Sequence, residues 1–326
     1  MQDIAIHATI SATSAQADTI TRARALELYR QGLAANTLRA QRDDVSRWAT
    51  FVHEQTGLEC DWHECLECWQ PVSYGLVTVF VAWLGLTYAS ATVNLTLSTV
   101  KTYCKLATQA GHMSAEQYAL INTVKGLHGQ AAKRHETRAS TKKQNWTRIS
   151  DEQRARLLAT PNTPQGRRDA VIVHILANLG LRVSELATLT VGDVDVAAKT
   201  LQVTRHKTLT TQTLRLYNGT LSAICNYLAL DRAGAQAGDL LLMGSNKWGQ
   251  LIGNMSIIAI QKRVGCLGNE AGIDNLSPHD LRHDWATRAV ARAPLSTVQA
   301  AGGWASPVMP LRYAAAGAIA NDGLEL

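Results

Sequence analysis

The chain has 326 residues, 46% of them hydrophobic, and its 32 Lys and Arg against 26 Asp and Glu give a net charge of +6. This length predicts about two domains with enough apolar content for two cores, which excludes a wholly disordered chain. The longest apolar stretch, residues 74–89, is shorter than the roughly 20 residues of a membrane-spanning helix, and the first residues lack a signal-peptide pattern, so we expect a cytoplasmic protein without a membrane partner.

The first part of the chain is predicted to be helical after a short tail. Residues 1–17 are rich in Ser, Thr and Ala and are typical of a flexible tail. Helical periodicity follows over residues 18–132, where Asp18 and Asn36 are placed to cap the first two helices, the first ending at Gly32. Further helices are expected over residues 73–87, 91–110 and 114–128.

Four possible metal ligands crowd together after the second predicted helix, namely Cys60, His63, Cys65 and Cys68. The spacing of Cys65 and Cys68 is that of half a zinc site, but no second pair follows at the usual distance. Six cysteines are also too few for a disulfide scaffold. We therefore expect reduced thiols here, with a zinc-dependent binding module as the alternative.

A basic linker is predicted to separate this part from a second domain. Residues 133–148 contain six Lys and Arg and one acidic residue, which favours an exposed strap along phosphates over a merely soluble linker. Ser150 and Gln153 have the spacing of a capping box that opens the second domain, residues 149–326.

The second domain is predicted to combine helices with one small sheet. Alternation over residues 194–195, 200–205 and 212–216 predicts three antiparallel strands. Helices are expected at 151–159, 165–179, from about 183, and at 218–231, 254–271, 278–292, 295–303 and 306–317. The expected fold class is therefore mainly α with a small antiparallel β-sheet.

Six polar side chains interrupt the apolar pattern of the second domain: Arg182, Glu185, Lys207, His279, Arg282 and Tyr313. His279 and Arg282 share one helix face because they are three residues apart. Two arginines, a lysine, a histidine and a tyrosine together suit nucleophilic attack on a phosphodiester without a metal.

These residues lie in segments that resemble the tyrosine site-specific recombinases, also called the phage integrase family. The segments are Gly-Leu-Arg182-Val-Ser-Glu185-Leu, His279-Asp-Leu-Arg282-His283, and Gly-Gly-Trp304 with Tyr313 nine residues later. The resemblance covers most of residues 150–316 and, more loosely, about 18–130. It implies a helical core-binding (SAM-like) DNA-binding domain followed by a tyrosine-recombinase catalytic domain.

The resemblance also implies the chemistry of these residues, with no metal or other cofactor. Tyr313 would be the nucleophile that forms a 3′-phosphotyrosyl bond, without ATP, and Arg182 and Arg282 would clamp the phosphate oxygens. Lys207 would be the general acid for the 5′-oxygen, with Arg205 as the competing basic residue.

The remaining positions of the motifs are expected to support this reaction. His279 would hydrogen-bond the phosphate or help move the tyrosine proton, and Glu185 would orient or balance the basic cluster. Trp304 stands where most members have histidine, so its role would be limited to phosphate contact and packing. His283 is expected to point elsewhere on the helix and to be structural.

Basic residues are expected to contact the phosphates of double-stranded DNA, although a solvated helix face is the alternative. They lie on the second helix, on the fourth helix and in the linker: Arg39, Arg42, Arg47, Lys101, Lys105, Lys133, Arg134, Lys142 and Lys143.

The resemblance further implies a homotetramer on two DNA sites, with a dimer on each site. The C-terminal segment 314–326, with Ile319, Leu324 and Leu326 as apolar anchors, is expected to dock on the neighbouring subunit. The short tail leaves no room for an additional arm-binding domain, which favours a simple recombinase of the Cre or Xer type. It would act at short inverted repeats in the nucleoid. The reaction would be integration or excision by a mobile element, or resolution. The resemblance does not decide whether a partner recombinase or an accessory protein is needed.

Two other functions use related features. A type IB topoisomerase has similar residues, but the two-domain layout and the spacing around Trp304 favour a recombinase. A catalytically inactive DNA-binding protein would not need the matched set of polar residues.

Overall fold

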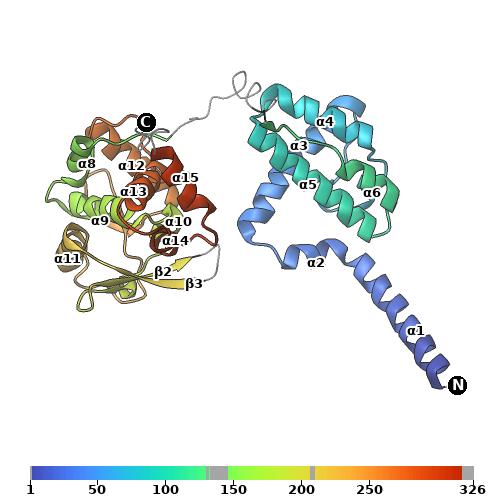
Figure 1. Cartoon of the computed structure of the whole chain (residues 1–326), viewed down its shortest axis with the longest axis horizontal. Helices are drawn as coiled ribbons and strands as arrows, with labels where there is room; N and C mark the ends of the chain where they lie inside the picture. The colour runs from blue at the N-terminus through green and yellow to red at the C-terminus, as the bar shows by residue number, and fades with distance from the viewer. Residues whose placement is uncertain (1, 130–131, 133–145, 206–209, 318–326) are drawn as a thin grey trace, which may run out of the picture. The chain divides into compact units, whose positions relative to one another are not determined.

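The computed structural model describes the backbone of residues 2–129, 132, 146–205 and 210–317, and the side chains of these residues apart from 2–9 and 315–317. The chain folds as two compact units, Met1–Gln144 and Asn145–Leu326, and the boundary between them falls inside the predicted linker (Figure 1). Several predicted site residues lie outside the described residues: Lys133, Arg134, Lys142, Lys143, Lys207 and the C-terminal residues 318–326.

The first unit is helical. Its described elements are α1 (Gln2–Ala23), α2 (Ala25–Gln31), α3 (Ala35–Thr56), a 3-10 turn η1 (Glu67–Trp69), α4 (Tyr74–Thr87), α5 (Ser90–Gln109) and α6 (Ala115–Asn122). An aromatic core joins α3, η1 and α4, because Trp48 stacks on Trp69 at 5.4 Å and meets Phe80 edge-on at 4.9 Å. All three rings are fully buried.

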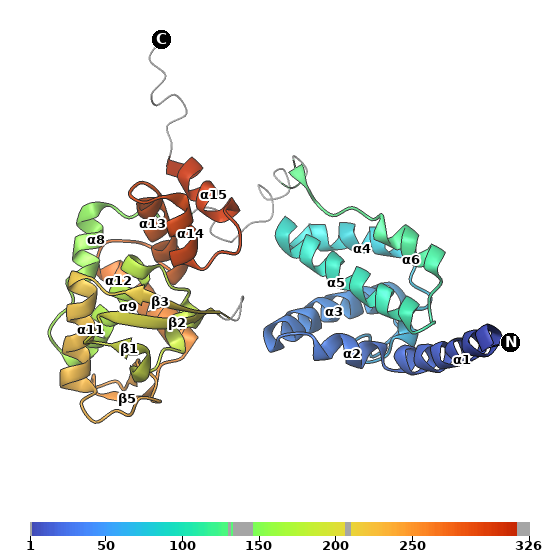
Figure 2. The same ribbon diagram turned by 60° about the horizontal axis from the view of Figure 1, so that its bottom comes forward.

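The predicted flexible tail is wrong in one respect, because residues 2–23 form a single helix, α1. Asp18 therefore lies inside a helix and does not cap one. The segment contains repeated alanines and neither Gly nor Pro, so the backbone can stay helical without a tertiary partner to specify it. Residues 10–23 are all exposed, and α1 leads away from the other helices of its unit (Figures 1 and 2).

Two further boundaries of the first unit differ from the predictions. Ala34, not Asn36, is the N-cap of α3. The helix predicted to reach residue 128 ends at Asn122, because Asn94 on α5 hydrogen-bonds both the N–H and the carbonyl of Leu127 and holds the following chain in a turn.

The cysteine prediction is also corrected. Cys60 and Cys68 are paired as a disulfide, which makes both unavailable as zinc ligands, while Cys65 is free. The described residues contain no group of three or more His, Cys, Asp or Glu side chains that could hold a metal ion.

The second unit is built around the buried helix α9 (Pro164–Leu179), which contacts five other helices. The other helical elements are α8 (Asp151–Leu158), α10 (Val183–Ala187), η2 (Val191–Asp193), α11 (Asn218–Asp231), α12 (Ile257–Glu270), α13 (Pro278–Val290), α14 (Leu295–Gly302) and α15 (Val308–Gly317). The predicted capping box of Ser150 and Gln153 is confirmed at the start of α8.

The predicted three-stranded antiparallel sheet is confirmed. It has the order β1 (Val194–Asp195), β2 (Thr200–Arg205) and β3 (Thr210–Arg215), with Leu201 opposite Leu214 and Arg205 opposite Thr210 (Figure 2). A second hairpin, β4 (Met243–Ser245) with β5 (Leu251–Asn254), was not predicted, and it shortens the helix expected from residue 254. The mainly α fold class with small antiparallel sheets is confirmed. No helix among the described residues is long and apolar enough to cross a membrane.

A buried carboxylate in the first unit generates a stability prediction. Asp44 on α3 accepts 2.7 Å hydrogen bonds from the hydroxyls of Thr96 and Thr99 on α5, and Arg47 lies 2.6 Å away. We expect Asp44→Ala to lower the free energy of unfolding by about 2–4 kcal/mol, because the two threonine hydroxyls and the Arg47 guanidinium lose the carboxylate that they bond. The neighbouring exposed Asp43→Ala should change it by less than about 0.5 kcal/mol. Urea unfolding of both full-length variants tests this, and equal effects would contradict the network.

Candidate active site

The loop between α9 and α10 presents the first predicted catalytic residue. Gly180 ends α9 with φ of 63°, and a Cβ added there would meet the ring of Trp285 at 2.2 Å, so only glycine fits without displacement. Arg182 follows as the N-cap of α10. Its backbone N–H and its Nη1 donate to the two carboxylate oxygens of Glu185, at 2.8 and 2.6 Å, which fixes the direction of its side chain.

Glu185 joins two guanidinium groups inside the second unit. Its carboxylate is buried, and it accepts from Arg205 Nη1 at 2.6 Å as well as from Arg182. Burial works to raise the pKa of Glu185, but the hydrogen bond from the Arg182 backbone and the charges of both arginines outweigh it and lower the pKa. Glu185 therefore stays ionised between two positive charges, as the predicted balancing role requires.

Arg205 at the end of β2 is a buried connector. Besides Glu185, its Nε donates to Gln212 on β3 at 2.8 Å and its Nη2 to the carbonyl of Ala301 on α14 at 2.6 Å. Gly303 passes so close that a Cβ there would lie 2.6 Å from Arg205 Nε. With no exposed surface, Arg205 connects β2 to α14 and is unsuited to protonating a leaving group. Its competitor Lys207 lies in residues 206–209, outside the described residues.

Arg282 on α13 is the central cation of the site. It is 3% exposed, and it donates to the carbonyls of Gly180, which ends α9, and of Gly302, which ends α14, the latter at 2.7 Å. Its guanidinium lies 4.7 Å from the ring of Trp304. Burial first, and then the charge of Arg182, lower the pKa of Arg282 to about 10. It is still protonated at neutral pH.

Two histidines one turn apart on α13 form a pair. His279 Nε2 and His283 Nε2 are 2.9 Å apart, and the rings meet edge-on at 4.4 Å. Burial lowers the pKa of both rings; the second cause is the positive charge of Arg282 for His279, and the neighbouring imidazole for His283. Both rings are therefore mainly neutral at pH 7 and able to accept a proton.

Tyr313 on α15 is packed among these groups. Its ring lies 5.0 Å from His283 and 5.6 Å from Trp304, and the residue is 3% exposed. Burial raises the pKa of Tyr313, although the positive charges of Arg282 and Arg182 work in the opposite direction. The phenol therefore keeps its proton at neutral pH until a base removes it.

The structure thus brings six of the predicted residues into one connected set drawn from four places in the chain: Arg182, Glu185, His279, Arg282, Trp304 and Tyr313. The expectation for His283 was wrong, because its ring points into this set and not elsewhere. Trp146, whose ring stacks on His283 at 5.2 Å, was missed entirely. The signal that could have found His283 is its position directly after Arg282 and one helical turn after His279.

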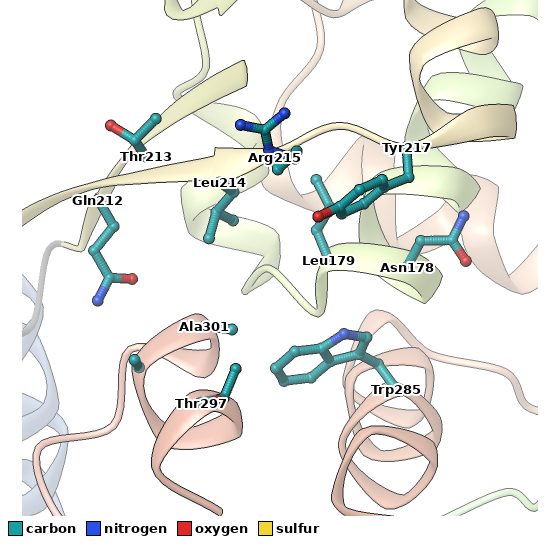
Figure 3. Close-up of a pocket in the computed structure, with 11 residues that line it drawn as sticks. Asn178, Leu179, Gln212, Thr213, Leu214, Arg215, Tyr217, Trp285, Thr297 and Ala301 are labelled. Atoms are coloured by element: carbon teal, nitrogen blue, oxygen red, sulfur yellow. The ribbon is translucent and has the colours of Figure 1, made fainter. Parts of the chain in front are cut away.

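A cavity of about 570 Å³ lies beside the site but does not contain its reactive groups. Trp285, Thr297 and Ala301 line one side of it, and Leu214 and Tyr217 lie opposite (Figure 3). Gln212, which fixes Arg205, also borders it. The cavity is largely apolar and is distinct from the polar set around Tyr313.

The predicted DNA-binding cations of the first unit fall into two groups. Arg47 pairs with Asp44 and lies over the ring of Tyr88, and Lys101 Nζ donates to the carbonyls of Asn122 and Val124. Both side chains thus hold the unit together. Three other cations are exposed: Arg39, Arg42 and Lys105.

The arrangement of the second unit suits an anionic ligand that reacts with a phenol. Arg182 and Arg282 provide fixed guanidinium groups, which match phosphate oxygens. The side chain of Arg282 donates to two groups among the described residues, and that of Arg182 donates to one. Each guanidinium has five N–H donors, so further N–H groups of both remain for a ligand. Tyr313 offers a phenol hydroxyl that is protonated at neutral pH, beside imidazoles that are neutral.

Comparisons with known proteins find a matching family and similar proteins. The model of the phage integrase family matches residues 147–318, over half of the chain. The chain is similar to the tyrosine recombinase XerC of Herpetosiphon aurantiacus, with 26% identity over 266 residues that cover 80% of this chain and 78% of the relative.

Solved structures share the fold. The integrase of the Tn1549 transposon, in complex with transposon right end DNA, superposes with a TM-score of 0.63 at 15% identity, covering 90% of this chain and 94% of that one. A lambda integrase dimer bound to a COC′ core site gives a TM-score of 0.59 at 15% identity, covering 88% and 90%. The chain belongs to the phage integrase family and is a tyrosine recombinase, an enzyme that cleaves and religates DNA strands.

Proposed function

We propose that the chain is a site-specific recombinase that cuts and rejoins double-stranded DNA through a covalent bond between Tyr313 and a 3′-phosphate. The observation that carries this proposal is the packing of the Tyr313 ring against Trp304, whose ring also lies against the guanidinium of Arg282. A nucleophile and a phosphate-binding cation therefore share one wall of the site.

In the proposed reaction, the Tyr313 oxygen attacks the scissile phosphorus and the bond to the 5′-oxygen breaks. Arg182 and Arg282 hold the non-bridging oxygens and stabilise the charge that develops on them. The tyrosine proton passes to the imidazole of His279, and Lys207 protonates the 5′-oxygen. Because the phosphotyrosyl bond retains the phosphoester, the reverse reaction joins a new 5′-hydroxyl without an energy source.

The burial and the hydrogen bonds of Arg205, the competing basic residue, support Lys207 as the general acid. Arg205 is buried and is held by Glu185, Gln212 and Ala301 at once. A guanidinium with these partners is unsuited to giving up a proton. Lys207, two residues further along the chain, is the remaining cation of that segment.

For the encounter with DNA, we propose that Arg39, Arg42 and Lys105 contact phosphates, together with the linker residues Lys133, Arg134, Lys142 and Lys143. The exposure of the first three supports this role. Arg47 and Lys101 keep a structural role, because their charged ends are held within the first unit.

We further propose assembly as a homotetramer on two sites, with a dimer on each short inverted-repeat site and segment 314–326 exchanged between subunits. Its apolar residues Ile319, Leu324 and Leu326 would be the anchors. Integration, excision and resolution all use this assembly, with or without a partner recombinase.

The nucleophile is tested with nicked duplexes tiled from DNA that flanks the gene. We expect Tyr313→Phe to retain DNA binding within about 2-fold and to lose covalent adducts by at least about 1,000-fold, because the attacking oxygen is absent. The exposed Tyr217→Phe serves as the matched control. Adducts should persist in excess EDTA, since the arginines supply the positive charge. Adducts formed by Tyr313→Phe would refute the assignment, and plasmid relaxation without recombined product would favour a topoisomerase.

The balancing role of Glu185 generates a second prediction. Glu185→Gln leaves the fully buried Arg205 without its charged partner, so we expect the free energy of unfolding to fall by about 3 kcal/mol and adduct formation to slow. Glu270→Gln removes an exposed carboxylate from the pair with Arg263 and should cost less than about 0.5 kcal/mol. Denaturation and cleavage are measured on both variants, and a Glu185→Gln protein as stable as the control would contradict the role.

The exchange segment is tested by deleting residues 317–326. We expect the truncated protein to bind a single site normally and to assemble poorly on two sites, because the apolar anchors are removed. Native gel shifts separate single-site complexes from paired-site complexes. Replacing Leu324 and Leu326 by serine should reproduce the defect, whereas Asp322→Asn should not. Unchanged recombination by the truncated protein would refute the exchange.

A further inference from the structure

We propose that His283 is a positioning residue for strand cleavage, which holds the ring of Tyr313 and fixes the orientation and tautomer of His279. The inference rests on the proposed role of Tyr313 as the nucleophile. His283 contacts three aromatic rings from three parts of the chain: Trp146 near the start of the second unit, His279 on its own helix, and Tyr313 on α15.

The first argument is the hydrogen bond between the two imidazoles. With Nε2 of His279 2.9 Å from Nε2 of His283, one nitrogen must carry the proton and the other must accept it. The bond therefore forces one ring into the Nδ1–H tautomer and the other into the Nε2–H tautomer. His279 uses Nε2 for this contact, so it has Nδ1 for a ligand, and the direction of the bond with His283 determines whether that Nδ1 donates or accepts.

The second argument is that His283 is itself held in place. Trp146 stacks almost parallel on it, with 9° between the ring planes. The neighbouring Thr147 is anchored to α13, because its backbone N–H donates to Asp280 Oδ1 at 2.9 Å. The imidazole therefore cannot swing away from His279 without breaking the stack with Trp146.

The third argument is an unpaired atom. Nδ1 of His283 is buried and has no hydrogen-bond partner among the residues that the structure describes. A residue that only filled space would be better replaced by an apolar ring, since an unpaired buried polar atom is unfavourable. His283 thus keeps a polar ring, and the one hydrogen-bond partner of that ring among the described residues is His279, which it contacts through Nε2.

The fourth argument is the position of Tyr313. Its ring lies against His283 on α13 and against Trp304, which follows α14, so contacts from two elements limit the motion of the phenol. Loss of either contact would leave the nucleophile free to leave the reactive geometry, which slows a reaction without weakening DNA binding.

Two substitutions distinguish the effect of the aromatic ring of His283 from the effect of its Nε2 hydrogen bond. His283→Phe keeps an aromatic ring against Trp146 and Tyr313 but removes the bond to His279. His283→Gln places an amide near the former Nε2 but removes the ring. The exposed His112→Phe is the control. Full-length proteins are compared for DNA affinity, for the single-turnover rate of adduct formation on nicked duplex, and for ring-nitrogen signals of ¹⁵N-labelled histidines.

We expect His283→Phe to bind DNA as the unaltered protein does, to form adducts about 10-fold to 100-fold more slowly, and to shift the ring-nitrogen signals of His279. His283→Gln should recover part of the rate, and His112→Phe should change nothing. Rates within 2-fold of the unaltered protein for both His283 variants, or unchanged His279 signals in His283→Phe, would overturn the proposal.

The unaltered protein provides a measurement that does not depend on the variants folding. One of the two Nε2 nitrogens should be protonated and the other not, and a spectrum with both in the same state would refute the hydrogen bond. Loss of adducts in Tyr313→Phe tests the proposed function separately. If the unaltered protein forms no adducts, that function fails, while the spectra still decide whether His283 fixes His279.

Discussion

The guanidinium of Arg282 is the interaction on which the rest of the site depends. From α13 it donates to the carbonyl that ends α9 and to the carbonyl that ends α14, and it lies over Trp304. It therefore ties the loop that presents Arg182 to the chain that leads to Tyr313. A single buried cation aligns the ends of two helices, and those carbonyls would otherwise need other donors. In the proposed function, the same group that organises the fold also holds the substrate phosphate.

Concentrating positive charge in a buried place has a cost that the structure offsets locally. Burial first, and then the positive charges of Arg182 and Arg205, lower the pKa of Arg282 to about 10. Glu185 is the buried carboxylate that compensates two of them. A bound phosphate would add negative charge beside the remaining cation. The site is thus electrostatically prepared for an anion.

Much of the fold could be predicted from local pattern. The capping box at Ser150, the glycine that ends α9 and the alternation of β2 and β3 are short-range signals, and each of these elements formed as expected. The errors have three separate causes. The length of α1, the early end of α6 and the hairpin β4–β5 depend on an alanine-rich segment whose residues 10–23 are exposed, on a hydrogen bond from Asn94, and on pairing between short strands. None of these is visible in the periodicity of the segment itself.

The sequence by itself determined which residue types are available for the reaction and in which order they occur, because the boxes around Arg182, Arg282 and Trp304 are local in the chain. Tertiary structure alone decided what each of them touches. It made Arg205 a buried connector, turned His283 toward Tyr313, and brought Trp146 onto His283 across more than a hundred residues. Contacts between distant segments are set by packing and by the need to pair buried charges and polar atoms, and no spacing within one motif encodes them.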